Sequence, residues 1–153
     1  FIDTSDFKPA QLGAAIDGIT RSGAERTGVI VQSFGFKRGI PPESDMMFDV
    51  RFIPNPFWIE SLRPLSGLDK PVAQYVMGFD EVLDFVSDVA GLVARLLPCY
   101  AREGKHRLTV SIGCTGGRHR SVCVACALAE MLKKEGIAVT LVHRDIDSDL
   151  QGR

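Results

Sequence analysis

The segment 108–121 places the strongest constraint on the fold, because its residue pattern passes from a strand to a glycine turn to a helix. Apolar residues alternate along 108–112, which is typical of a β-strand. Glycines within 113–117 permit backbone angles that are closed to other residues. From His119 the apolar spacing becomes helical. This order predicts an anion site, because amide N–H groups at the turn and the helix N-terminus lack partners and the helix dipole favours negative charge.

Side chains of the same loop add charge and hydrogen-bond donors to this site. Arg118 and Arg120 supply positive charge, His119 supplies a further donor, and Thr115 and Ser121 supply hydroxyl groups. A phosphate or a similar oxyanion is therefore expected to bind the loop residues Cys114, Thr115, Gly116, Gly117, Arg118, His119, Arg120 and Ser121.

Strands and helices are expected to alternate along the chain. Strands are expected at 28–33, 46–52, 108–112 and 137–142, and helices at 9–19, 79–97 and 119–136. The helix 79–97 is expected to end before Pro98, because proline removes a backbone donor and restricts the residue before it. This alternation predicts a three-layer α/β domain with a mainly parallel sheet.

Two irregular segments are candidates for ligand contact. The segment 34–42, rich in Gly and Pro, follows a predicted strand, at the sheet edge where open α/β folds bind ligands. The connector 53–71 contains four prolines, and a connector of this length is more often functional than not. Asp49 and Arg51 share one face of a predicted strand. They fit a structural ion pair and a sugar-hydroxyl acceptor beside a phosphate clamp equally well.

Length and charge limit the class of protein. A chain of 153 residues suits a single domain, here 1–153. The net charge of -1 implies no overall attraction to nucleic acid or to a membrane, and no apolar run is long enough to span a bilayer. Because the chain begins at Phe1 rather than at methionine, it is expected to be a piece of a longer protein.

The four cysteines are expected to be free thiols in a reducing cytoplasm, since their number does not suggest a disulfide scaffold. Cys123 and Cys126 have the spacing of a redox or metal motif, but they lie within a predicted helix and no second Cys or His pair completes a zinc site. We interpret them as buried helix residues, expect Cys99 in the core as well, and predict no metal.

The loop also fits a competing hypothesis, a cysteine-dependent phosphatase. Cys114-x5-Arg120 followed by Ser121 matches the signature in which a thiolate attacks phosphorus and arginine holds the oxygens. Such enzymes usually carry His before the cysteine, where this chain has Gly113. They also need an aspartic general acid, for which Asp45, Asp49 and Asp69 are loose candidates. Binding without catalysis needs no general acid, so it is favoured.

Basic residues outside the loop allow a second kind of partner. A surface for RNA phosphates could be formed by Arg102, Lys105, Arg107, Lys133, Lys134 and Arg144. Most basic runs are simply solvated, and no aromatic-rich strand typical of an RNA-reading module is present. No P-loop motif is present either, so we expect no ATP or GTP site in this chain.

Several motifs in order resemble the RapZ/YvcJ family. They are Ser33–Pro42, Phe48–Pro56, Leu62–Asp69 and Thr109–Ser121, with Ile2–Ser5 and Val142–Asp145 at the borders. The resemblance runs nearly end to end, but it covers only the C-terminal domain of that family. The resemblance does not extend to the family's N-terminal P-loop domain, which would hold the nucleotide and which we expect to lie outside this sequence.

The resemblance implies an adapter rather than an enzyme, with a fold similar to part of 6-phosphofructokinase. In enterobacterial members this domain senses glucosamine-6-phosphate and binds small regulatory RNAs, one of which is presented to RNase E. Carried over by motif, Asp49 would face the sugar, and the phosphate would be held by Cys114, Thr115, Gly116, Gly117, His119 and Arg120. We expect Arg38, in the Lys37–Arg38 loop, to assist. The family also implies a homo-oligomer.

The chain departs from the sugar-sensing members at Arg38 and at Phe57, where those members carry His, and in its acidic 145–149 tail, where they carry Lys and Arg. The first two departures bear on which anion is recognised, and the third replaces the basic tail that those members use for RNA.

Overall fold

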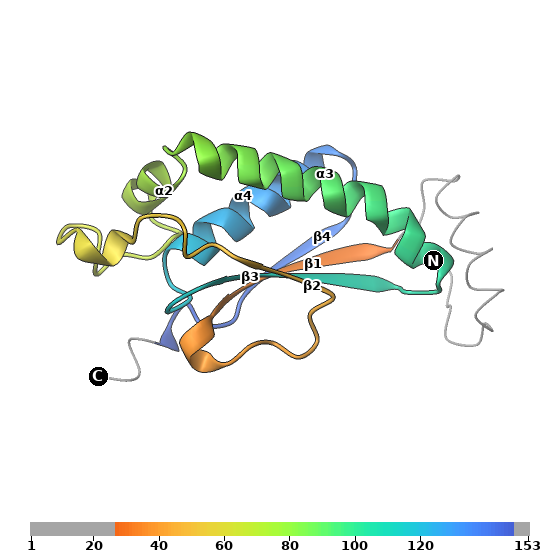
Figure 1. Ribbon diagram of the computed structural model, residues 1–153, viewed down its shortest axis with the longest axis horizontal. Helices are drawn as coiled ribbons and strands as arrows, with labels where there is room; N and C mark the ends of the chain where they lie inside the picture. The colour runs from red at the N-terminus through yellow and green to blue at the C-terminus, as the bar shows by residue number, and fades with distance from the viewer. Residues whose placement is uncertain (1–26, 149–153) are drawn as a thin grey trace.

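The computed structural model describes residues 27–148, so the helix expected at 9–19 lies outside them. The β-branched and apolar runs form one four-stranded sheet in the order β2-β3-β1-β4, in which all neighbours are parallel. The strands are β1 (Gly28–Gly35), β2 (Met46–Asp49), β3 (Arg107–Cys114) and β4 (Val139–His143). In Figure 1 these strands point in one direction, so that their carboxyl ends meet at one edge.

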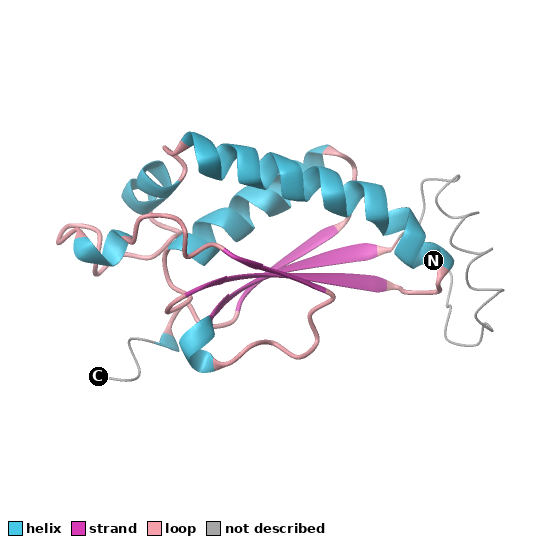
Figure 2. Cartoon of the chain, in the orientation of Figure 1, coloured by secondary structure: helices cyan, strands magenta, loops and turns pink. Residues whose placement is uncertain are grey.

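The α-helices within 27–148 lie on one face of the sheet (Figures 1 and 2). They are α2 (Lys70–Val76), α3 (Asp80–Arg102) and α4 (Arg120–Lys134), accompanied by the short 3₁₀ helices η1 (Phe36–Arg38) and η2 (Pro56–Trp58). The connections from β2 through α3 to β3, and from β3 through α4 to β4, advance in the same direction across the sheet. Right-handed crossovers therefore place both helices on one face. The link from β1 to β2 runs in the other direction, and it lies over the opposite face.

The apolar core fills the space between the sheet and the helices. Val31, Val110 and Ile112 of the sheet are fully buried, and so are Leu128 and Leu132 of α4. Burial of such side chains contributes roughly 1.5–3 kcal/mol each, which makes this layer the main source of stability.

The opposite sheet face is more polar, and its groups are paired with the β1–β2 link. The Ser44 and Ser111 hydroxyl groups lie 2.6 Å apart. The Gln32 amide donates to the Glu43 carboxylate, and the Thr109 N–H donates to Asp45. Hydrogen bonds therefore help to hold the link against the sheet.

The prediction of an α/β domain on a parallel sheet is confirmed, and the arrangement is consistent with the expected three-layer sandwich. The predicted end of α3 is wrong, because the helix continues through Pro98 to Arg102. Pro98 is exposed, whereas the buried face of the helix includes Val93 before it and Ala101 after it. Packing of that face offsets the lost backbone hydrogen bond. The expectation of a buried Cys99 is also wrong, since this thiol is exposed.

Two strand boundaries differ from those expected. β3 runs on through Gly113, which pairs with Phe34 of β1 and Asp49 of β2, to Cys114. A Cβ at position 113 would meet the Phe34 ring at 2.5 Å. Gly113 thus permits close packing within the strand rather than a turn. β2 ends at Asp49 rather than at position 52, and a turn follows at Arg51. Within 27–148, no helix is both long enough and apolar enough to cross a membrane.

Candidate functional site

The loop between β3 and α4 lies at the carboxyl edge of the sheet and is braced by the end of β1. Gly117 has φ +79°, and a Cβ there would lie 2.6 Å from the Gly35 nitrogen. The Gly35 N–H donates to the Asp145 carboxylate at 2.8 Å, and Asp145 in turn pairs with Arg144. Only glycine fits both the backbone angle and this close approach at position 117.

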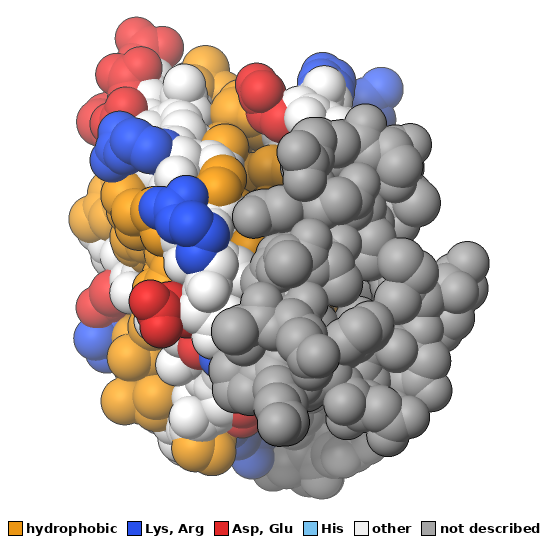
Figure 3. Space-filling view, turned by 90° about the vertical axis from the view of Figure 1, so that its right-hand side faces the viewer, with side chains coloured by type: hydrophobic (Ala, Val, Ile, Leu, Met, Phe, Trp, Pro, Cys, Tyr) orange, Lys and Arg blue, Asp and Glu red, His pale blue; other side chains and the backbone are white. Residues whose placement is uncertain are grey.

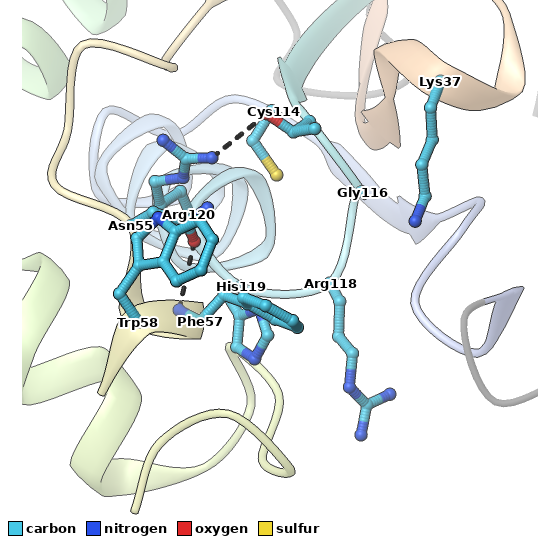
Figure 4. A pocket seen from close by; sticks show the side chains of 10 residues that line it. Lys37, Asn55, Phe57, Trp58, Cys114, Gly116, Arg118, His119 and Arg120 are labelled. Carbon is cyan, nitrogen blue, oxygen red and sulfur yellow. Dashed lines mark hydrogen bonds between the residues drawn. The ribbon is translucent and has the colours of Figure 1, made fainter. Parts of the chain in front are cut away.

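A pocket of about 260 Å³ opens beside this loop (Figure 4). It is lined by Lys37, Asn55, Phe57, Trp58, Cys114, Thr115, Gly116, Arg118, His119 and Arg120. The volume lies near the lower end of the range for small-ligand sites. Lys37, Arg118 and Arg120 carry positive charge and no lining residue is acidic, so the pocket favours an anion.

Arg120 is the central cation of the pocket and is only 5% exposed. Its guanidinium donates to the carbonyl oxygens of Ile53 (2.9 Å) and Arg51 (3.2 Å), and to the Thr115 hydroxyl (3.3 Å). Its Nε is buried without a hydrogen-bond partner. Among the described residues, no carboxylate lies within ion-pair distance of this group.

Burial lowers the pKa of Arg120, but arginine stays protonated in proteins. A buried charge is costly to leave unpaired. An anion in the pocket would supply the missing partner.

Cys114 lies in the pocket wall but exposes little of its surface (2%). Its thiol donates to the Ser121 hydroxyl at 3.1 Å, and its sulfur accepts the Gly117 N–H at 3.3 Å. Ser121 is fully buried behind the loop. The Cys114 thiol and the Ser121 hydroxyl therefore hold the loop in shape, whereas Thr115 is the exposed hydroxyl at the pocket.

Arg118 and His119 line the pocket with their polar atoms turned elsewhere. Arg118 donates to the carbonyl oxygens of Pro64, Leu65 and Ile146, and Figure 4 shows it directed away from Arg120. His119 Nε2 lies 3.2 Å from the Arg63 carbonyl oxygen. Burial lowers the pKa of His119, so its ring is neutral near pH 7. Both residues tie the connector to the loop, and their predicted contact with phosphate remains a prediction.

Asp49 and Arg38 lie outside the pocket lining. Asp49 forms a bidentate ion pair with Arg51, at 2.7 Å for the closest atoms, and this contact is the main cause that lowers the pKa of Asp49. The geometry favours the structural-pair interpretation of these two residues. Arg38 donates to the Ser148 carbonyl oxygen, while its neighbour Lys37 extends from η1 toward the loop at Gly116 (Figure 4).

Sequence reasoning missed the contribution of η2 to the pocket. Asn55, Phe57 and Trp58 line it, and all three belong to the connector that was expected to be functional. Phe57 was singled out only as a departure from the family. One sequence signal could have indicated Trp58: it forms an aromatic pair with Phe57 among the prolines of a long connector. No helical or strand periodicity in that connector predicts burial of these two rings in the core.

The three aspartates considered as general acids each have their carboxylate engaged by another group. Asp45 pairs with Lys105 at the start of β2, Asp49 pairs with Arg51, and Asp69 accepts the Ser66 N–H before α2. None of the three lines the pocket. The arrangement therefore supports anion binding better than phosphoester cleavage.

Most of the candidate RNA contacts lie at the far end of the sheet from the pocket. Arg102 ends α3, Arg107 begins β3 and Lys133 lies in the last turn of α4. Lys105 and Lys134 lie beside them in the chain, whereas Arg144 follows the carboxyl end of β4. Figure 3 looks onto the end of the molecule where α3 terminates, and its coloured part shows basic side chains interspersed with acidic and apolar ones. Their binding to RNA stays a prediction.

Cys123 and Cys126 lie on α4, away from the pocket lining. Burial raises the pKa of the Cys123 thiol to about 12. Cys126 is half-buried and lies 3.7 Å from His143 Nε2. Within 27–148, no group of three His, Cys, Asp or Glu side chains is placed to hold a metal ion.

Comparison with known proteins places these features in a family. A family model described as the RapZ C-terminal domain matches residues 27–147. Nucleotide-binding protein TTE1834 of Caldanaerobacter subterraneus subsp. tengcongensis is 48% identical over 150 residues, which cover 97% of this chain and 53% of that protein. Nucleotide-binding protein CA_C0511 of Clostridium acetobutylicum is 49% identical over 152 residues, which cover 97% of this chain and 52% of that protein. The chain thus spans about half the length of the curated relatives it matches.

Proposed function

Because the chain belongs to the family of RapZ C-terminal domains, we propose that it is a non-catalytic sensing domain that binds a phosphorylated metabolite in the pocket beside the 114–121 loop. The observation that carries the proposal is the Arg120 guanidinium, which lies buried at the pocket without an acidic partner among the described residues. A phosphate group would accept from the guanidinium and from the Thr115 hydroxyl beside it.

The ligand that we propose is an amino-sugar phosphate of the glucosamine-6-phosphate type. Resemblance to the sugar-sensing members supports this choice. Lys37 adds positive charge at the rim. Asp49 does not line the pocket, but its negative charge raises the pKa of Arg120 and so acts on the electrostatic potential of the site.

Occupancy of the pocket would control contacts with other macromolecules. We propose a small regulatory RNA and a ribonuclease as partners, in a cytoplasmic homo-oligomer. The relatives are named nucleotide-binding proteins and are about twice as long as this chain. We assign the nucleotide site to the part of those proteins that this chain does not cover. The four cysteines form no disulfide, which fits a reducing compartment.

Isothermal titration of the chain with glucosamine-6-phosphate tests the proposal, with glucosamine and inorganic phosphate as controls. Each mixture is also assayed for released phosphate. Binding that needs the phosphate group, without release, is the expected result. Release of phosphate that Cys114→Ser abolishes would instead establish the phosphatase. Absence of binding to every phosphate compound would refute the sensing site.

A further inference from the structure

We propose that Cys126, His143 and Ser33, here called the thiol cluster, form a modification site at which Cys126 exchanges with a small disulfide and His143 acts as the base. The three side chains come from α4, β4 and β1, and none of them lines the pocket beside the 114–121 loop. The proposal therefore goes beyond the proposed function, in which these side chains have no part.

The pairing of β4 with β1 brings His143 beside Ser33. The two residues are register partners in parallel strands, so their side chains lie on the same face of the sheet. Val31, two positions before Ser33, is a core residue, so this is the face that the helices cover. The Ser33 hydroxyl is fully buried and lies 2.7 Å from His143 Nδ1. A buried hydroxyl needs a hydrogen-bond partner, and this contact orients the imidazole ring.

The helix α4 places the Cys126 thiol against the other nitrogen of that ring. The Cys126 sulfur lies 3.7 Å from His143 Nε2. Cys126 and His143 are both partly exposed, and β4 is an edge strand of the described sheet. A small reagent can therefore reach this sulfur. Cys123 differs, because its thiol is buried and donates to the Gly67 carbonyl oxygen at 3.5 Å.

The thiol and the imidazole form a neutral pair before any reaction near pH 7. Burial raises the pKa of the Cys126 thiol, and the Glu130 carboxylate adds to this shift while Lys133 opposes it. Burial also lowers the pKa of His143. Thiolate is therefore scarce, and Cys126 depends on a base at the moment of attack. A nucleophile beside a base that a third group orients is the arrangement that activates serine and cysteine in covalent catalysis.

The exchange needs no further oxidant. The imidazole acts as a base in the tautomer that donates its Nδ1–H to Ser33, because Nε2 then carries the lone pair. The Cys126 proton passes to Nε2, and the thiolate attacks one sulfur of the small disulfide. The disulfide bond of the reagent breaks as the new S–S bond forms, and the leaving thiolate takes the proton from His143. One thiol and one disulfide are thus converted into one mixed disulfide and one thiol.

Timed reaction with glutathione disulfide, followed by peptide mass spectrometry, measures the rate at each cysteine. Exposed Cys99 lies outside the thiol cluster and serves as the internal reference. In the unaltered chain Cys126 should form the mixed disulfide, whereas Cys123 should not. His143→Gln should lower the rate at Cys126 relative to Cys99 by about 10- to 100-fold, because the variant has no base at this position. Ser33→Ala should lower the same ratio by a smaller factor, because it removes only the group that orients the ring.

The direction of the change separates a base from a merely structural residue. Looser packing around Cys126 would expose its thiol and raise its rate, so only the loss of a base lowers it in a chain that still unfolds cooperatively. Val142→Ala is the matched control, because Val142 is an exposed neighbour of His143 on β4, and its ratio should stay within about twofold of the parent value.

Three results would overturn the proposal. The first is an unaltered chain in which Cys99 reacts and Cys126 does not. The second is an unchanged or higher ratio in His143→Gln, and the third is a fall in Val142→Ala as large as that in His143→Gln. If His143→Gln does not unfold cooperatively, Ser33→Ala decides by the same criterion.

Discussion

Replacing Arg120 with alanine is the sharpest test of the anion site. The guanidinium is almost completely buried, and it joins the loop at Thr115 to the connector at Ile53. A hydrogen bond to a charged group contributes about 1.5–3 kcal/mol. Loss of one such bond to phosphate should therefore weaken binding by roughly 10- to 150-fold. If the guanidinium makes two such bonds to the ligand, the loss will begin near the upper end of this range.

The effect on stability has a different origin and is measured separately. Arg120→Ala leaves the carbonyl oxygens of Ile53 and Arg51 without their donor, which costs stability, but it also removes a buried charge, which relieves a penalty. Arg120→Lys keeps the positive charge but loses the planar guanidinium, which donates to both the loop and the connector. We expect Arg120→Lys to bind phosphate compounds with an affinity between those of the parent chain and Arg120→Ala.

The assay combines calorimetry with thermal unfolding. A ligand present at 100 times its Kd stabilises the folded chain by about 2.7 kcal/mol. At the same ligand concentration, a loss of affinity of roughly 10- to 150-fold should reduce this stabilisation in Arg120→Ala to about 1.4 to 0.3 kcal/mol. Arg95→Ala is the matched control, because Arg95 is an exposed arginine on α3 outside the pocket lining. A folded Arg120→Ala that binds glucosamine-6-phosphate within about twofold of the Arg95→Ala control would refute the reasoning.

Three further predictions concern the scaffold. Gly117→Ala should lower the free energy of unfolding by about 1–3 kcal/mol more than Gly39→Ala does, as measured by chemical denaturation. Both glycines have positive φ, but of the two only Gly117 also meets neighbouring backbone within 3 Å. Equal losses in the two variants would contradict this prediction. Burial lowers the pKa of His119, so the unfolded chain binds more protons and stability should fall as pH drops below about 6.5. His119→Asn should flatten part of that fall in denaturation curves, and an unchanged slope would count against it. Alkylation followed by mass spectrometry should modify exposed Cys99 long before Cys123, whose pKa is raised to about 12, and similar rates would disprove the burial of Cys123.

Local patterns predicted the framework of the site. Alternation along 108–112, the glycines that follow and the helical spacing after His119 place a loop between a strand and a helix, and the structure has β3 and α4 there. Parallel strands could be expected from the alternation of strands with helices. The order β2-β3-β1-β4 could not, because it depends on which strands pair across long stretches of chain.

These local patterns did not predict which groups the arginine side chains of the loop would contact. Arg118 and Arg120 are two positions apart in one loop, and both were expected to hold phosphate. Arg118 donates to the carbonyl oxygens of Pro64 and Leu65, more than fifty positions earlier in the chain, and to that of Ile146, while its contact with phosphate stays a prediction. Such acceptors become available only when distant segments fold against the loop. The same holds for the aromatic residues of η2, whose distance from the loop in sequence hides their place in the pocket.

The sequence by itself determined that an electropositive, glycine-bearing turn would stand at the end of a buried strand, because backbone freedom and helix termini are properties of neighbouring residues. Tertiary structure decided which cation faces the pocket and what lies opposite it. Arg120 remains without an acidic partner among the described residues, because the carboxylate of Asp49 is already paired with Arg51. Trp58 stands at the same pocket because the connector folds back onto the loop. These outcomes depend on competition among partners that only the folded chain brings within reach.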